Sequence, residues 1–321
     1  FLIYILLIIF VSLLSLISRF NFFHVYIFPL ALMAFILKIF FDEYVAIFFF
    51  LIAVFLIAFI VPNSFEYIII EFVAGFSAVF GLSQFTRRGQ LYISSIAVFA
   101  AMSFIYMGIA IIQEGTFSSI NWINFMYFAF YGLLLLSAYP LIYAFERAFG
   151  FVSDITLLEL SSTNHALLQK LSNVAPGTFQ HSLQVSSIAE AAAKKIGANA
   201  MLVRVAALYH DIGKTVSPAF FVENQITGYN PHDQIGFEQS AQIIINHVTN
   251  GINLATKHKL PQQIIDFIRT HHGTTTVQYF HKNYIKKYPE KIDEVEMFTY
   301  PGPRPFSKET AILMMSDAIE A

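Results

Sequence analysis

The chain has 321 residues, of which 56% are hydrophobic and only 12% charged, and its formal net charge at pH 7 is −2. An apolar excess of this size, with 36 phenylalanines, excludes an ordinary soluble protein. The near-neutral charge offers no basic surface for a nucleic-acid polymer. The absence of cysteine excludes disulfides and thiolate metal sites, so any bound metal must have nitrogen and oxygen ligands.

The charged residues are unevenly distributed along the chain. Residues 1–150 carry five Lys/Arg and six Asp/Glu, against fourteen and fifteen in residues 151–321. We therefore expect a transmembrane region at 1–145, a connecting helical linker at 146–172 and a soluble domain at 173–321. The chain starts with Phe1 inside an apolar run rather than with Met, so we expect it to be a fragment whose upstream segments are missing.

Six apolar stretches in the transmembrane region approach the length of about 20 residues that crosses a bilayer. They cover residues 1–18, 23–41, 44–61, 67–84, 91–112 and 124–145. Arg87 and Arg88 form the only clustered positive charge in a short loop, which predicts that this loop is cytoplasmic. Two spans follow it, so the soluble domain is predicted to be cytoplasmic too. Glu71 lies in the fourth span, where a carboxylate is costly and often functional, unless it lies near enough to the span's end to reach the interface.

The soluble domain is predicted to be all-helical, which makes the whole chain all-α: a polytopic transmembrane helical bundle followed by a helical domain. Apolar residues at helical spacing, with start and stop signals, predict five helices. They are expected at 176–197, 200–210, 238–248, 261–272 and 307–317. Residues 215–235 and 273–306 are rich in Gly, Pro, Asn, Tyr and Lys, and we expect loops there.

Seven potential metal ligands lie beside the apolar stripes of these helices: His181, His210, Asp211, His247, His271, His272 and Asp317. Helix packing would bring them together in the core, where unpartnered imidazoles and carboxylates are costly. A closed structural zinc site needs four ligands. Seven nitrogen and oxygen ligands instead favour two divalent transition-metal ions, Fe or Mn.

Such a centre indicates phosphate-ester hydrolysis, because two neighbouring metal ions activate water and bind the oxygens of a phosphate. Asp211 is central in the order of ligands, and we expect its two oxygens to bridge the two ions. Lys214 follows His210 by four residues and lies beside Gly213, where it is placed to bind a phosphate oxygen. Asp211 and Lys214 are therefore the predicted catalytic residues.

This ligand pattern resembles the HD phosphohydrolase superfamily in its two-metal form. Within it the chain is most similar to the seven-transmembrane HD-domain phosphodiesterases of bacteria, which degrade cyclic di-AMP. The motifs that carry the resemblance are Ala175–Thr178 before His181, Leu208–Lys214, Glu223–Gln225 followed by Asn230–Asp233, His271–Thr275 and Tyr300–Pro305. The resemblance covers the last six membrane spans and most of the HD domain. Position 180 is Gln where many relatives have a second histidine.

The resemblance implies a division of the seven ligands between the two ions. His181, His210, Asp211 and Asp317 would hold one ion, and His247, His271 and His272 the other, with Asp211 shared. It also implies hydrolysis of cyclic di-AMP to 5′-pApA by a multi-pass protein of the bacterial inner membrane. The family has an extracellular ligand-sensing domain and helical residues beyond Asp317, which we expect to be missing here.

Several alternatives stay open at this point. One is the same chemistry on cyclic di-GMP, although the loop at Gly273–Val277 lacks the Gly-Tyr-Pro signature of those enzymes. A (p)ppGpp hydrolase is a second alternative, although it would leave the membrane half unexplained. A third is a non-catalytic nucleotide-binding membrane receptor, which would be expected to lack one of the metal-binding residues. Homodimerisation is open. A purine base could stack on or hydrogen-bond with loop residues, the candidates being Tyr229, Tyr279, Phe280 and Arg304.

Overall fold

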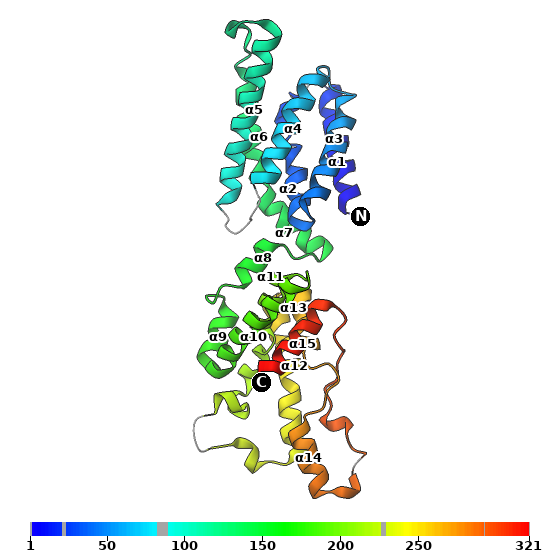
Figure 1. Ribbon diagram of the computed structural model, residues 1–321, viewed down its shortest axis with the longest axis vertical. Helices are drawn as coiled ribbons and strands as arrows, with labels where there is room; N and C mark the ends of the chain where they lie inside the picture. Colours follow the sequence, from blue (N-terminus) through cyan, green and yellow to red (C-terminus); the bar gives the residue numbers. More distant parts are fainter. Residues whose placement is uncertain (1, 21–23, 82–88, 226–228, 292, 321) are drawn as a thin grey trace. The chain divides into compact units, whose positions relative to one another are not determined.

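The computed structural model describes residues 2–20, 24–81, 89–225, 229–291 and 293–320. It divides into two compact helical units, Phe1–Ile155 and Thr156–Ala321 (Figure 1). Within the described ranges, β pairing is limited to an isolated antiparallel bridge between Thr276 and Thr299. The predicted all-α class is confirmed.

In the residues that the structure describes, the first unit contains seven helices and two short 3-10 turns. Their bounds are α1 (Leu2–Phe20), η1 (Val25–Ile27), α2 (Ala31–Phe40), α3 (Glu43–Ala58), α4 (Ser64–Gly81), α5 (Gln90–Glu114), η2 (Phe117–Ser119), α6 (Ile123–Leu135) and α7 (Ala138–Phe149).

Three described helical stretches are long and apolar enough to cross a membrane: Ser64–Gly81, Gln90–Gln113 and Ile123–Phe149. The other three expected spans coincide with shorter apolar helices, Ile3–Leu16, Val25–Phe40 and Glu43–Ala58. A helix of 16 residues such as α3 rises about 24 Å, less than the roughly 30 Å of the hydrocarbon core. The loop with Arg87 and Arg88, on which the predicted orientation depends, lies outside the described residues.

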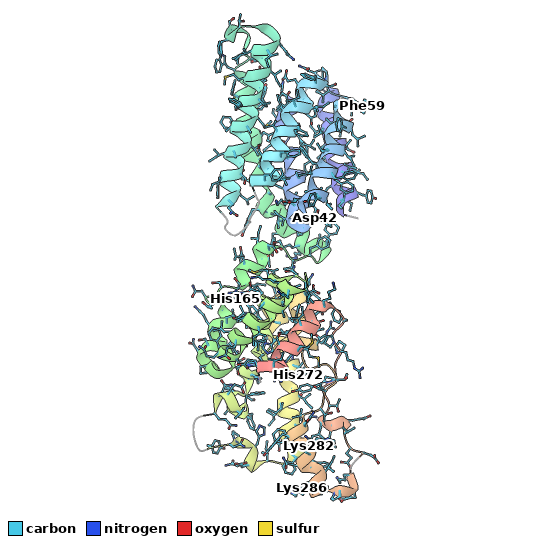
Figure 2. All side chains as sticks on the ribbon, in the orientation of Figure 1. Asp42, Phe59, His165, His272, Lys282 and Lys286 are labelled. Carbon is cyan, nitrogen blue, oxygen red and sulfur yellow. The ribbon has the colours of Figure 1, made fainter. Side chains whose placement is uncertain are left out.

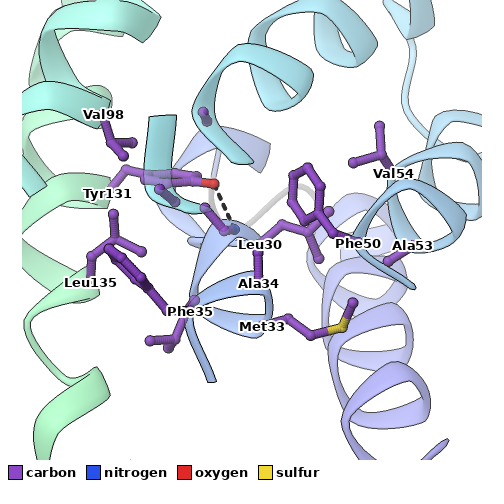
Figure 3. Packing of buried hydrophobic residues seen from close by; sticks show 14 of the residues in the cluster. Leu30, Met33, Ala34, Phe35, Phe50, Ala53, Val54, Val98, Tyr131 and Leu135 are labelled. Carbon is purple, nitrogen blue, oxygen red and sulfur yellow. Dashed lines mark hydrogen bonds between the residues drawn. The ribbon is translucent and has the colours of Figure 1, made fainter. Parts of the chain in front are cut away.

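The core of this unit is built around α2, whose residues from Ala31 to Leu37 are all buried (Figure 3). The Tyr131 hydroxyl of α6 accepts a hydrogen bond from the backbone N–H of Ala31 at 2.9 Å and donates one to Glu71 Oε2 at 2.7 Å. This bridge joins α2, α4 and α6. Glu71 is fully buried in the middle of α4, so the interpretation that it reaches an interface near the span's end is wrong.

The stretch expected at 124–145 is interrupted, because α6 ends at Leu135 and α7 begins at Ala138. Pro140 has no backbone N–H, and its ring clashes with the carbonyl of the residue four positions earlier in a continuous helix. That residue is Leu136, where the chain turns. The backbone N–H groups of Leu136 and Ser137 donate to carbonyls three residues back, which tightens the last turn of α6.

The described part of the second unit contains eight helices, the first of which crosses the boundary between the units. Their bounds are α8 (Asp154–Leu160), α9 (Ala166–Val174), α10 (Pro176–Lys195), α11 (Ala200–Tyr209), α12 (Phe237–Lys257), α13 (Gln262–Thr270), α14 (Gln278–Lys287) and α15 (Lys308–Glu320). The same described residues also form six 3-10 turns: η3 (Ile212–Val216), η4 (Pro218–Phe220), η5 (Val222–Asn224), η6 (Pro231–Gln234), η7 (Pro289–Lys291) and η8 (Glu296–Phe298). Within this unit α10 packs against α11 and α15, and α12 packs against α13 and η3.

Two features of this unit differ from the sequence prediction. Residues 278–287 form α14 rather than a loop, because Phe280 and Tyr284, four residues apart, bury one aromatic face against Phe298. Helix α12 continues to Lys257, beyond its expected end near 248. Gly251, which resembles a stop signal, lies inside that helix where Gly213 packs closely against it.

Candidate metal centre

The seven predicted ligands come from five helices or their ends and converge in the second unit. His181 lies on α10, His247 on α12 and Asp317 on α15. The pairs at 210–211 and 271–272 begin at the C-cap residues of α11 and α13. Their ligand atoms form three groups with members within 4.8 Å of one another: His247, His271 and His272; His181, His210 and Asp317; His210, Asp211 and His271. Figure 2 labels His272 among the side chains of this unit.

Asp211 lies between two sets of imidazoles and turns one oxygen towards each. Its Oδ1 is 3.2 Å from Nε2 of His247 and 3.7 Å from Nε2 of His271. Its Oδ2 is 3.3 Å from Nε2 of His210 and 3.7 Å from Nε2 of His181. A carboxylate placed in this way can serve both sets at once.

Three of the imidazoles are oriented by the helix that carries them. In each, Nδ1 lies within hydrogen-bond distance of the carbonyl oxygen three residues earlier, which fixes the tautomer and leaves Nε2 to face the centre. The pairs are His210 with Ala207 at 2.7 Å, His247 with Ile244 at 2.5 Å and His271 with Ile268 at 2.8 Å.

A glycine allows the segment with Asp211 to approach α12 closely enough for these contacts. A Cβ on Gly213 would lie 1.8 Å from the carbonyl oxygen of His247 and 2.5 Å from the backbone nitrogen of Gly251. Both obstacles are backbone atoms of a helix, so neither can rotate away. Any larger residue at 213 would push Asp211 and Lys214 away from His247.

Burial and neighbouring charges shift the pKa values of the histidines of this cluster in opposite directions. Burial by itself lowers the pKa of His210, but the Asp211 and Asp317 carboxylates beside it raise that pKa to about 10. The pKa of His271 is lowered by burial, and burial together with the neighbouring imidazoles holds the pKa of His272 well below its usual range. His271 and His272 are thus neutral at pH 7, the state in which imidazole binds a metal ion.

The donor set suits divalent metal ions. Nε2 of His210 and Oδ1 of Asp211 are buried and make no hydrogen bond. Buried polar atoms are ordinarily paired, and metal ligation supplies the missing partner. Imidazole nitrogens and carboxylate oxygens together suit divalent metal ions such as Fe, Mn or Zn, and the converging groups of ligand atoms could hold such an ion.

A cleft of about 390 Å³ opens beside this centre. Its lining residues are Gly177, Gln180, His181, Gln184, Asp211, Lys214, Val222, Glu223, His272, Asp317 and Glu320. Lys214 Nζ lies 2.7 Å from Asp211 Oδ2 and 2.9 Å from Glu223 Oε1. Glu223 also accepts from the Thr178 hydroxyl at 2.8 Å, and the Asn224 amide oxygen accepts from the backbone N–H of Thr178 at 3.1 Å.

Sequence reasoning gave no role to two carboxylates that the structure places beside the predicted residues. Glu223 pairs with Lys214, and Glu320 contacts His181. Glu320 follows Asp317 by three residues, so helical spacing was the signal that could have identified it. The four suggested base contacts, Tyr229, Tyr279, Phe280 and Arg304, do not line the cleft.

Both halves of the chain match known protein families. Residues 1–153 match the model described as 7TM receptor with intracellular HD hydrolase, and residues 178–321 match the HD domain model. The cyclic-di-AMP phosphodiesterase PgpH of Listeria monocytogenes is 39% identical over 253 residues, which are 77% of this chain and 34% of the relative. PgpH of Bacillus subtilis is 36% identical over 270 residues, or 81% of this chain and 37% of the relative. The chain thus spans about a third of the length of these curated relatives.

A solved structure also matches part of the chain. It is the crystal structure of the L. monocytogenes PgpH HD domain in complex with cyclic-di-AMP, with 46% sequence identity and a TM-score of 0.48. The match covers 50% of this chain and 73% of that chain.

Proposed function

We propose that this chain, whose two halves match the models described as 7TM receptor with intracellular HD hydrolase and as HD domain, hydrolyses cyclic di-AMP to linear 5′-pApA. The observation that carries the proposal is the position of Asp211, with one oxygen towards each imidazole set and Lys214 beside it at the cleft. Relatives named cyclic-di-AMP phosphodiesterase support the choice of nucleotide.

The ligands divide into two sets in this proposal. His181, His210 and Asp317 hold one ion, and His247, His271 and His272 hold the other, with Asp211 common to both. Fe or Mn suits these nitrogen and oxygen donors. When bound, the two ions activate water and stabilise the charge that develops on the phosphate.

Lys214 binds a non-bridging phosphate oxygen in the proposed mechanism. Burial alone would lower the pKa of its ammonium, but the Asp211 and Glu223 carboxylates raise the pKa above its ordinary value. Lys214 is therefore protonated throughout the neutral range. Its two ion pairs hold Nζ at the cleft, so the charge is in place before substrate arrives.

The reaction is the addition of water across one phosphodiester link. The water oxygen forms a bond to phosphorus, and the bond from phosphorus to the 3′ oxygen breaks. The 3′ oxygen leaves with a proton as a hydroxyl group, and the phosphate stays on the 5′ oxygen. One such step opens the ring and gives 5′-pApA.

We assign residues 1–145 to the membrane, 146–172 to the connecting segment and 173–321 to the hydrolase domain. The apolar helices support the first part, and the HD match from residue 178 supports the last. The protein is proposed to lie in the bacterial inner membrane with its hydrolase domain in the cytoplasm. Addition of a protease to intact cells should then leave the hydrolase domain uncut, and cleavage there would contradict this orientation.

The decisive test of function is hydrolysis of cyclic di-AMP, cyclic di-GMP and a short RNA, side by side, by the whole chain in detergent loaded with Mn or Fe. We expect selective release of 5′-pApA by the native chain and none by Asp211→Ala. Faster cleavage of cyclic di-GMP or RNA would change the substrate class. Binding of two metal ions and of cyclic di-AMP without turnover of any substrate would favour a nucleotide-binding receptor.

A further inference from the structure

His181 differs from the three imidazoles that are oriented by their own helices. Its Nδ1 contacts a carboxylate oxygen of Glu320 on another helix, α15, instead of a carbonyl oxygen of α10. Its Nε2 faces the centre, 3.0 Å from Oδ1 of Asp317. The orientation of this one ring thus depends on a tertiary contact between α10 and α15.

Helix α15 presents both carboxylates on one face, because Asp317 and Glu320 are separated by three residues. Both side chains are largely buried, with exposed fractions of 12% for Asp317 and 17% for Glu320. They meet opposite edges of the same imidazole, since Asp317 contacts Nε2 and Glu320 contacts Nδ1. Glu320 is accordingly absent from the groups of converging ligand atoms.

We propose that Glu320 is a positioning residue for the first metal site: it accepts the Nδ1 proton of His181 and so presents Nε2 to the ion. The inference rests on the two-metal centre of the proposed function. A carboxylate that accepts from the remote nitrogen of a metal-binding histidine fixes its tautomer and ring orientation and makes the ligating nitrogen more basic. Glu320 does not bind the ion itself.

Three substitutions separate the contributions of hydrogen bonding and charge. Glu320→Gln keeps an oxygen that accepts from Nδ1 but removes the charge, whereas Glu320→Leu removes both with little change in size. Glu290→Gln alters an exposed carboxylate of the same unit and serves as the matched control. All variants are made in the whole chain, purified in detergent, freed of metal and titrated with Mn²⁺.

The readouts are the affinity of each Mn²⁺ site, followed by the electron paramagnetic resonance signal of free Mn²⁺, and the unfolding midpoint of the metal-free protein. We expect Glu320→Leu to weaken one site about 10- to 100-fold, as loss of such a partner typically does, with the other site unchanged. Glu320→Gln should lie between Leu and the native chain, and Glu290→Gln should match the native chain. If Glu320→Leu fails to fold, the comparison rests on Glu320→Gln.

The inference would be overturned if every Glu320 variant that folds bound Mn²⁺ at both sites with native affinity. It would also be overturned if the substitutions weakened Mn²⁺ binding equally at both sites. Because metal binding is measured without substrate, this result is separable from the proposed function. A chain that binds two Mn²⁺ ions in a Glu320-dependent way but cleaves no cyclic dinucleotide would refute the hydrolase and leave the role of Glu320 intact. An active enzyme whose Mn²⁺ affinities did not change on substitution of Glu320 would support the hydrolase and refute the role of Glu320.

Discussion

Substitution of Gly213 by alanine tests whether close packing of η3 against α12 places the metal centre. The added Cβ would lie 1.8 Å from the His247 carbonyl oxygen, whereas ordinary contact begins at 3.4 Å. The segment must therefore retreat by about 1.6 Å to restore normal contact. Overpacking of this kind costs about 1–3 kcal/mol of unfolding free energy.

The same displacement moves Asp211 away from His247, whose Nε2 is 3.2 Å from Asp211 Oδ1. Misplacement of a reacting group by about 1 Å lowers rate by roughly 100-fold. We therefore expect Gly213→Ala to lower kcat for cyclic di-AMP by about that factor and to bind less metal per chain. The assays are product formation by chromatography, metal content by mass spectrometry and thermal unfolding in detergent.

Gly236→Ala is the matched control, because its Cβ would approach only the flexible carboxylate end of Glu238, at 3.1 Å. It should keep native activity and metal content. If Gly213→Ala also kept two metal ions per chain and the native kcat, the close approach of η3 to α12 would not be what places Asp211. The steric argument for this glycine would then be refuted.

Removal of both metal ions by a chelator should abolish hydrolysis and lower the unfolding midpoint. Addition of Mn or Fe should restore the activity and the midpoint. Activity that survives chelation would contradict a metal-dependent reaction. The Lys214→Met variant should still bind two ions, but its kcat/KM should fall on the order of 10²–10³-fold, as it does when one transition-state donor is removed. Native kinetics would exclude the role of Lys214 in binding a phosphate oxygen. Metal-free protein should lose stability as pH rises from 7 through 10 in denaturant titrations. The Asp211 and Asp317 carboxylates raise the pKa of His210 from its ordinary 6.5 to about 10. The stability that protonated His210 contributes is therefore complete below pH 6.5 and is lost as the folded group loses its proton near pH 10. Stability that does not change between pH 7 and about 10 would contradict this effect of the two carboxylates on His210. Tyr131→Phe should lower the unfolding free energy by about 1–3 kcal/mol because it leaves buried Glu71 and the Ala31 N–H unpaired. Glu71→Gln can still accept from Tyr131 and should cost less, and the opposite order would argue against the bridge.

Periodicity and hydropathy predicted the parts of the fold in which neighbouring residues in the sequence share one environment. Apolar residues three and four positions apart predict the helices that contain Val185 and Ile264, and the scarcity of charged residues predicts the membrane region. The break at Leu136 was also predictable, since Pro140 lies four residues later. Helix α14 was missed because its buried face consists of aromatic residues within an otherwise polar segment.

Contacts across long sequence separations could not be predicted in this way. Glu71 and Tyr131 are 60 residues apart, and His181 and Glu320 are 139 apart. A carboxylate near a helix end has the pattern of a solvated residue, and the only local feature that distinguishes Glu320 from Glu309 on the same helix is its spacing of three residues from Asp317. Only the packing of α15 against α10 gives Glu320 its partner.

The two adjacent ligand pairs show why their sequence context was nevertheless informative. Consecutive residues inside an α-helix point about 100° apart, so they cannot both face one centre. Each pair begins at a helix C-cap, His210 after α11 and His271 after α13, where the backbone leaves the helical path. Gly273 adopts a positive φ of 54°, which turns the chain directly after the second pair. A histidine doublet or His-Asp pair at the end of an apolar helix, with a glycine one or two residues later, therefore indicates two ligands for one centre, whereas the same pair within a helix does not.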